Sequence, residues 1–166
     1  MMQEQFDRLG DVASKLNEAT DRMMASIREF DLDLLQLSLG VVADGPPYQV
    51  ISNDDFEEDE SALDGVGGIP VTRSCLTYGR FGKANKFTIH VVRRIEVQLP
   101  DGSYSVIGRD FMDLSSLCRT EKMLAIATIP GLIDALLGVS VSLEERITQA
   151  TDVVEGLSRT LRETVA

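Results

Sequence analysis

Two long segments, one at each end of the chain, place apolar side chains at alternating steps of three and four residues. Near the N-terminus this stripe runs from Phe6 to Phe30, and acid–base pairs such as Glu4 and Arg8 lie on the opposite face. The spacing follows one face of an α-helix, and each such pair adds a few tenths of a kcal/mol. We therefore expect a helix over residues 3–29, in which Gly10 costs about 1 kcal/mol relative to alanine.

A matching stripe runs from Leu143 to Thr164 at the C-terminal end, and Ser142 with Glu145 forms a capping box at its start. At 1.5 Å per residue the two helices are about 40 and 34 Å long, long enough to lie side by side along most of their length. Small or apolar residues flank both stripes, which favours a bundle of several helices, or packing on a sheet, over a two-stranded coiled coil. The expected association face consists of Leu9, Leu16, Met23, Ile27, Ile147, Val154, Leu157 and Leu161.

Between these ends the hydrophobic period changes to two. Residues 35–41 alternate between apolar and polar or small, residues 44–47 have turn chemistry, and residues 48–52 predict a second strand. Alternation in the later part of the chain is typical of a half-buried antiparallel sheet. Further strands are expected at residues 69–81, 86–99 and 103–109, with turns at 82–85 and 100–102.

Residues 113–138 predict a helix in two pieces, with Pro130 near the start of the second piece and Gly138 at its end. The expected fold class is therefore α+β: an antiparallel sheet of about five strands flanked by N-terminal and C-terminal amphipathic, heptad-patterned helices. We expect a single domain over residues 1–166. Its parts are the N-terminal helix (1–30), the sheet (31–110, with an acidic loop at 53–64) and the helical C-terminal part (111–166).

Charge is distributed unevenly along the chain, whose formal net charge is −11. Residues 1–64 carry −12, residues 65–94 carry +6, and residues 95–166 carry −5. Within residues 65–94, aromatic side chains alternate with the cations in a way that suits phosphate contact and base stacking. The candidate anion- or partner-binding residues of this basic island are Arg73, Arg80, Lys83, Lys86, His90, Arg93 and Arg94.

The basic island has two interpretations. It either complements acidic side chains of this protein or of a neighbouring subunit, which we favour in a chain with 27 acids, or it binds nucleic acid or an anionic ligand. Arg93 conflicts with strict alternation, because it would share the apolar face of its strand. A bulge at Val91 and Val92 would remove that conflict.

Other candidate sites give weaker signals. The acidic run 53–60 lacks the glycine and glutamate register of a calcium loop, so we expect a solvated loop or a tether for a basic partner. The glycine-rich stretches 65–68 and 79–83 do not precede a helix, as a phosphate loop would, and predict a connection and a hairpin turn. Cys75 and Cys118 lack zinc-ligand spacing, so we expect both to be core residues.

These features lead to a functional hypothesis of association. One histidine and no nucleophile–base pair give no catalytic residues, and we expect no enzyme activity, no metal and no cofactor. We expect an assembly protein, such as a structural subunit, adaptor or chaperone, that forms homo-oligomers or joins other subunits through its terminal helices. The alternative is a nucleic-acid or anionic-ligand module built on residues 73–94. A third alternative, an enzyme of unrecognised type, predicts a concave pocket with perturbed titratable groups near His90 or Arg93. Without an apolar run of 18 residues or a leader pattern, we expect no membrane insertion and a cytoplasmic location, free or within a large assembly.

Overall fold

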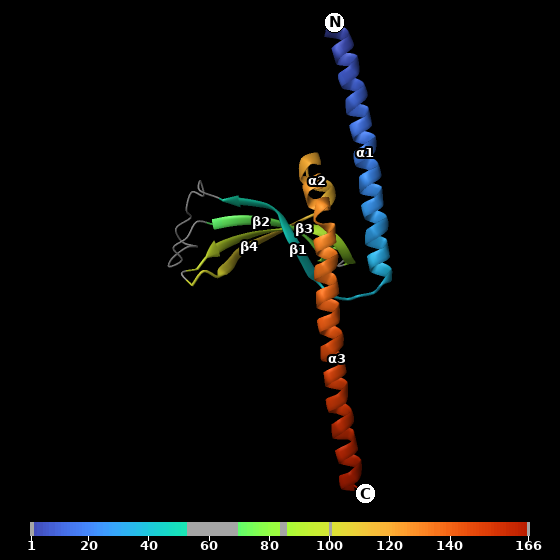
Figure 1. Ribbon diagram of the computed structural model, residues 1–166, viewed down its shortest axis with the longest axis vertical. Helices are drawn as coiled ribbons and strands as arrows, with labels where there is room; N and C mark the ends of the chain where they lie inside the picture. Colours follow the sequence, from blue (N-terminus) through green and yellow to red (C-terminus); the bar gives the residue numbers. More distant parts are fainter. Residues whose placement is uncertain (1, 53–69, 84–85, 100, 166) are drawn as a thin grey trace.

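The computed structural model describes residues 2–52, 70–83, 86–99 and 101–165. It is an α+β fold in which one antiparallel sheet of four strands is combined with a long N-terminal helix and two C-terminal helices (Figure 1). The strands lie in the sheet in the order in which they occur in the chain. The elements are α1 (Met2–Gln36), β1 (Ala43–Ser52), β2 (Pro70–Phe81), β3 (Lys86–Gln98), β4 (Tyr104–Met112), a 3₁₀ turn η1 (Leu114–Ser116), α2 (Arg119–Ala127) and α3 (Ile129–Val165).

In the part of the chain that the structure describes, the sheet has one face packed on helices and one face without them. Alternation along β2 and β3 places Leu76 and Tyr78 opposite Val91 and Ile89 on the first face, which we call the helix face. These four residues are buried in one cluster with side chains of α1 and α3. The buried members of the cluster are Ile27, Leu34, Val41, Ala43, Leu76, Tyr78, Ile89, Val91, Leu114, Leu117, Ala125, Leu132 and Leu136.

The predicted count of about five strands is wrong, because residues 35–41 do not form a strand. The stripe of α1 continues in helical steps through Phe30 to Leu34, which is buried, and the helix ends only at Gln36. The predicted turn at residues 44–47 is instead the first half of β1, whose register with β2 shifts twice across that stretch. Both prolines there lie in an edge strand, where a missing backbone donor is tolerated.

The strands predicted at 69–81, 86–99 and 103–109 correspond closely to β2, β3 and β4. The described parts of the two predicted turns hold Gly82 and Gly102, both with positive φ, which glycine adopts without steric cost. The acidic loop 53–64 and the glycine-rich residues 65–68 lie outside the described residues.

The C-terminal helix is longer than expected and has no break at Gly138 or Ser142. Gly138 is not in the left-handed conformation that ends helices, and the apolar period of Leu132 and Leu136 continues to Leu143. The helix therefore runs unbroken from Ile129 to Val165.

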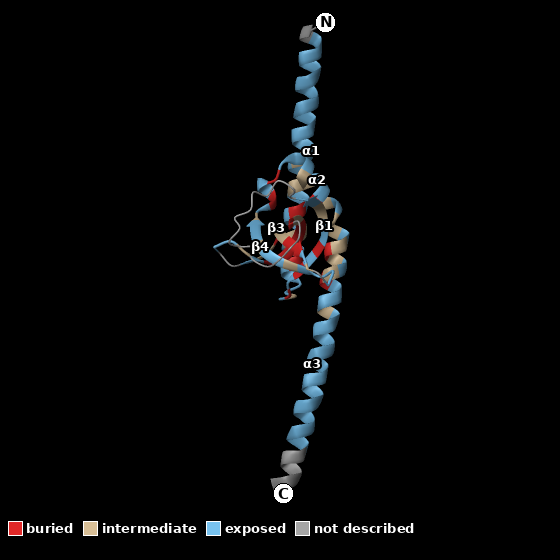
Figure 2. Cartoon of the chain, turned by 90° about the vertical axis from the view of Figure 1, so that its left-hand side faces the viewer, coloured by how far each residue is buried: buried red, intermediate tan, exposed pale blue. Residues whose placement is uncertain are grey.

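The two long helices do not lie side by side along most of their length within one chain. α1 packs on β3, whereas α3 packs on β1 and β2. Their free parts project from the sheet in opposite directions, and the two ends of the chain lie at opposite ends of the molecule (Figure 1). Figure 2 shows buried residues gathered at the centre and exposed residues along both projections.

Candidate functional site

The seven residues of the predicted basic island occupy the β2–β3 hairpin but do not form one patch. Arg73, His90 and Arg94 lie on the sheet face opposite the helices, which we call the opposite face, whereas Arg93 lies on the helix face. The remaining three lie near the turn that joins β2 to β3. Lys83 and Lys86 are exposed there, and the Arg80 guanidinium lies 5.4 Å from the centre of the Phe87 ring.

Three arginines of the island form ion pairs within the chain. Arg73 Nε lies 2.8 Å from a carboxylate oxygen of Glu96, and Arg94 pairs with Asp44 of β1. Thr77 also donates a hydrogen bond to Asp44, at 2.6 Å. For these arginines the placement supports the interpretation that the island complements the protein's own acids.

Arg93 keeps its place on the helix face without the predicted bulge. The β2–β3 register runs without a shift through Val91 and Val92, so strict alternation holds. The guanidinium instead reaches Glu121 of α2, with Nη2 at 3.0 Å from Oε1. The second carboxylate oxygen of Glu121 accepts the backbone N–H of Cys118 at 3.3 Å. The charge is therefore compensated by an acid from a distant helix, which no local pattern signals.

His90 is the only histidine and is buried on the opposite face, with 1% of its surface exposed. Its ring stacks on Phe81 at 4.7 Å between centres, and Nδ1 lies 3.1 Å from the Thr88 carbonyl oxygen. Burial lowers the pKa of His90 below its ordinary value, and the Thr88 hydrogen bond and nearby carboxylates only partly offset this. The ring is therefore neutral near pH 7 and does not act as one of the island's cations.

A cavity of about 440 Å³ opens on the opposite face beside these residues. Its walls combine charged, polar and apolar side chains from all four strands and from the segment before β1. Arg109 of β4 lines this cavity and was missing from the predicted site. Arg109 lies opposite Arg94 only because the β3–β4 register shifts by one residue between Ile95 and Glu96. Extending the pairing from the turn without this shift would place Gly108 opposite Arg94. The lining residues are Gly40, Val42, Asp44, Thr77, Gly79, Arg80, Phe87, His90, Val92, Arg94, Arg109 and Phe111.

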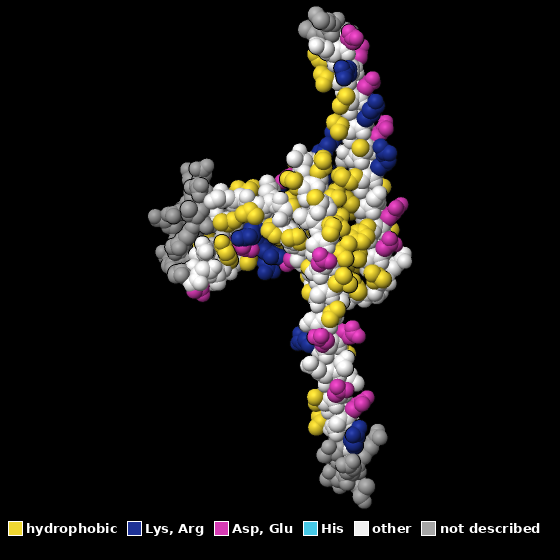
Figure 3. Space-filling view, viewed as in Figure 1, with side chains coloured by type: hydrophobic (Ala, Val, Ile, Leu, Met, Phe, Trp, Pro, Cys, Tyr) yellow, Lys and Arg dark blue, Asp and Glu magenta, His cyan; other side chains and the backbone are white. Residues whose placement is uncertain are grey.

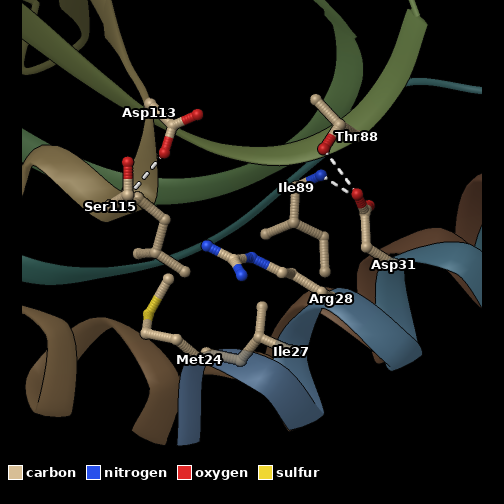
Figure 4. A pocket seen from close by; sticks show the side chains of 9 residues that line it. Met24, Ile27, Arg28, Asp31, Thr88, Ile89, Asp113 and Ser115 are labelled. Atoms are coloured by element: carbon tan, nitrogen blue, oxygen red, sulfur yellow. Dashed lines mark hydrogen bonds between the residues drawn. The ribbon is translucent and has the colours of Figure 1, made fainter. Parts of the chain in front are cut away.

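A smaller cavity of about 160 Å³ separates α1 from β3 and η1, and Figure 4 shows its lining side chains. Asp31 of α1 accepts two hydrogen bonds from β3, one from the Thr88 hydroxyl at 2.6 Å and one from the Ile89 backbone N–H at 2.8 Å. Asp113 accepts the Ser115 backbone N–H at 2.6 Å on the other side. The two bonds of Asp31 fix the C-terminal part of α1 to β3, whereas the Asp113 bond caps η1, so the polar groups of this cavity hold neighbouring elements in place.

The predicted association face divides into a buried and an exposed part. Ile27 belongs to the protein's own core, and Met23 is half-buried against it. The other described residues of the face are exposed, each between 46% and 64%: Leu9, Leu16, Ile147, Val154 and Leu157. Leu161 lies in α3, but its side chain is outside the described residues.

We call the exposed helix segments the N-terminal arm (residues 4–19) and the C-terminal arm (residues 141–159). Every side chain of the N-terminal arm is exposed, including Phe6 at 64%, and the same holds for the C-terminal arm. In Figure 3 apolar side chains gather along one side of the upper helix, and charged side chains lie along the other.

The two thiols have different environments. Cys75 is buried on the opposite face, as predicted, and burial raises the pKa of its thiol. Cys118 is exposed and precedes the first turn of α2, so the prediction that both are core residues is wrong for Cys118.

Comparison with protein-family models, curated proteins and solved structures finds no match to this chain. Within the described ranges, no group of three or more His, Cys, Asp or Glu side chains is placed to hold a metal ion. The same ranges contain no single helix that is long and apolar enough to cross a membrane. The pair formed by α2 and residues 129–159 passes by length and composition only when taken together, and it is bent by 44°.

Proposed function

We propose that this protein is a non-enzymatic assembly subunit that associates with a second copy of itself through its two arms. One observation carries the proposal: both arms leave a heptad-spaced apolar stripe uncovered. The stripe includes Phe6, Leu9 and Leu16 on the N-terminal arm, and Ile147 and Leu157 on the C-terminal arm.

Projecting helices of this kind gain little stability on their own. Most helix stability in proteins comes from packing an amphipathic face rather than from helix propensity. Covering one exposed leucine or phenylalanine contributes about 1.5–3 kcal/mol. A continuous uncovered stripe on both arms therefore favours a partner that covers it.

The direction of the helices supports one arrangement in particular. α1 and α3 run in the same sense along the long axis, and the N-terminal arm projects at one end while the C-terminal arm projects at the other (Figure 1). A two-fold axis perpendicular to the long axis brings the C-terminal arm of a second copy, running in the opposite sense, beside the N-terminal arm of the first. The same operation forms the second, identical helix pair at the other end, so the contact closes as a dimer.

The sizes of the arms fit this reciprocal pairing. At 1.5 Å per residue they are about 24 and 28 Å long, so they match over nearly their whole length. A helix pair about 25 Å long and about 10 Å wide buries roughly 500 Å², which is half of what a specific interface needs. Two such pairs reach about 1,000 Å², and this favours the closed dimer over a single helix contact.

The native mass tests self-association directly. Light scattering at low and high salt should give twice the chain mass of 18.2 kDa in both conditions, because an apolar interface is not screened by salt. Leu16→Asp and Leu157→Asp should each reduce the mass to that of the monomer, since each places a charge in the stripe.

Matched controls place the same charge on the polar side of each arm. Ser14→Asp and Gln149→Asp lie outside the stripe on exposed positions and should keep the dimer mass. A wild-type protein that is monomeric at 18.2 kDa, or controls that dissociate as readily as the stripe variants, would overturn the proposal. A stable complex with a different protein in place of the dimer would also overturn it.

A further inference from the structure

We infer that the opposite face of the sheet holds a binding site for a small organic anion, built on two arginines, Arg94 and Arg109, of a row of three. Arg73 lies opposite Arg94 in the β2–β3 register, and Arg94 lies opposite Arg109 in the β3–β4 register. The three arginines thus follow one another across three neighbouring strands. The Arg73 guanidinium lies over the Tyr104 ring, 4.9 Å from its centre, whereas Arg94 and Arg109 line the cavity. Like charges directly opposite each other destabilise a sheet, so this row is an unfavourable arrangement for a purely structural surface.

The protein's own acids compensate the row only in part. Glu96 pairs with Arg73, and Asp44 pairs with Arg94. Within the described residues Arg109 has neither an ion pair nor a hydrogen bond, and the buried Nε of Arg94 has no hydrogen-bond acceptor. The Arg94 Nε is a buried donor without an acceptor, and Arg109 is an exposed cation without a counter-ion among those residues, so an added anion would complement both.

The cavity beside the row indicates the class of ligand. Its volume of about 440 Å³ lies in the range that holds small molecules. Arg94 and Arg109 line one part of it and supply planar donor pairs that suit a carboxylate or a phosphate. Val42, Val92 and Phe111 line it too, and Phe111 is 49% exposed. A ligand that places an acidic group on the two arginines and a flat apolar body against Phe111 contacts both the charged and the apolar wall of the cavity.

This site is independent of the proposed dimer, because the lining residues belong to the sheet and the segment before β1, not to either arm. It also differs from a general basic surface. The whole chain is acidic, at −11, so non-specific attraction of anions is weak away from the cavity.

Phenyl phosphate is a suitable probe, since it joins an acidic group to an aromatic ring. Isothermal titration of the full chain should show binding of phenyl phosphate and about tenfold weaker binding of inorganic phosphate. Arg109→Met, which keeps the side-chain length and removes the charge, should weaken phenyl phosphate binding by about tenfold or more. Arg109→Lys should have an intermediate effect, because it keeps the charge and loses the planar pair of donors.

Lys83→Met provides the matched control, because it removes one cation from the same hairpin outside the cavity. Its affinity for phenyl phosphate should stay within about threefold of the wild-type value. The melting temperature of ligand-free Arg109→Met should equal or exceed that of the wild type, since the substitution relieves like-charge repulsion.

Four results would overturn the inference, three from titration and one from the melting temperature. The first is no binding of phenyl phosphate up to about 10 mM, where affinity would be negligible. The second is that Arg109→Met and Lys83→Met weaken phenyl phosphate binding equally. The third is that phenyl phosphate and inorganic phosphate bind with equal affinity. A marked drop in the melting temperature of Arg109→Met would likewise contradict it, because a stabilising residue is not one held for a ligand.

Discussion

Single polar residues on this sheet are compensated by partners far away in the chain. Arg93 pairs with Glu121 across 28 positions, and Asp31 of α1 accepts the backbone N–H of Ile89 across 58 positions. The alternation of β3 predicts which face each residue occupies. It does not predict the partner, because the partner comes from another element. Sequence therefore identified the arginines of the island and not their ion pairs.

His90 gives a prediction at this scale. Because burial lowers its pKa in the folded state, the unfolded chain binds the proton first as the pH falls below its usual pKa of about 6.5. The free energy of unfolding should therefore decrease from pH 7.5 to pH 5. Asp113 does not contribute in this window, since its lowered pKa keeps it charged until the pH falls to about 4 and below.

Urea unfolding of the wild type and of His90→Gln at several pH values measures this effect. The glutamine variant does not titrate, so its free energy of unfolding should change less over the same range. Equal pH dependence in the two proteins would show that His90 is not the group responsible.

At the scale of elements, periodicity predicted helix and strand types better than it predicted where they end. The stripe of α1 continues beyond Phe30 in helical steps, yet residues 35–41 also alternate and so match a strand. Packing decides the outcome, because Leu34 enters the core as part of a helix. The predicted helix end at Gly138 is likewise not observed. Gly138 does not adopt the left-handed backbone that ends helices, and α3 continues through it.

Two glycines of α3 should respond in opposite ways to alanine. A Cβ on Gly131 would lie 2.6 Å from two ring carbons of Pro46 in β1, so Gly131→Ala should destabilise the fold by about 1–3 kcal/mol. A Cβ on Gly138 meets nothing within 4 Å, so Gly138→Ala should stabilise it by about 0.5–1 kcal/mol. Urea unfolding of both variants measures the difference. Similar effects of the two substitutions would mean that α3 does not approach β1 closely at Gly131.

For the whole molecule, sequence predicted an α+β fold, with heptad helices at both ends of the chain. It did not predict that these helices project in opposite directions, because their relative placement depends on which strands each one packs against. The cavity on the opposite face was missed for a similar reason. Arg109 lies outside the basic island in sequence and joins Arg94 only through the shifted pairing of β4.

The most direct test of the proposed reciprocal dimer is the native mass of a mixture of two variants, Leu16→Asp and Ile147→Lys, whose positions lie beside each other when the two arms pair in opposite directions. Alone, each variant carries its charge in both helix pairs and should be a monomer of 18.2 kDa. In a mixed dimer both charges fall in the same helix pair, one opposite in sign to the other, and the second pair is wild type. Mixing should therefore restore a species of twice the monomer mass, weaker than the wild-type dimer. The alternative is that the N-terminal arms of the two copies pair with each other, and the C-terminal arms likewise. Every helix pair of a mixed dimer would then contain one charge, and the mixture would remain monomeric.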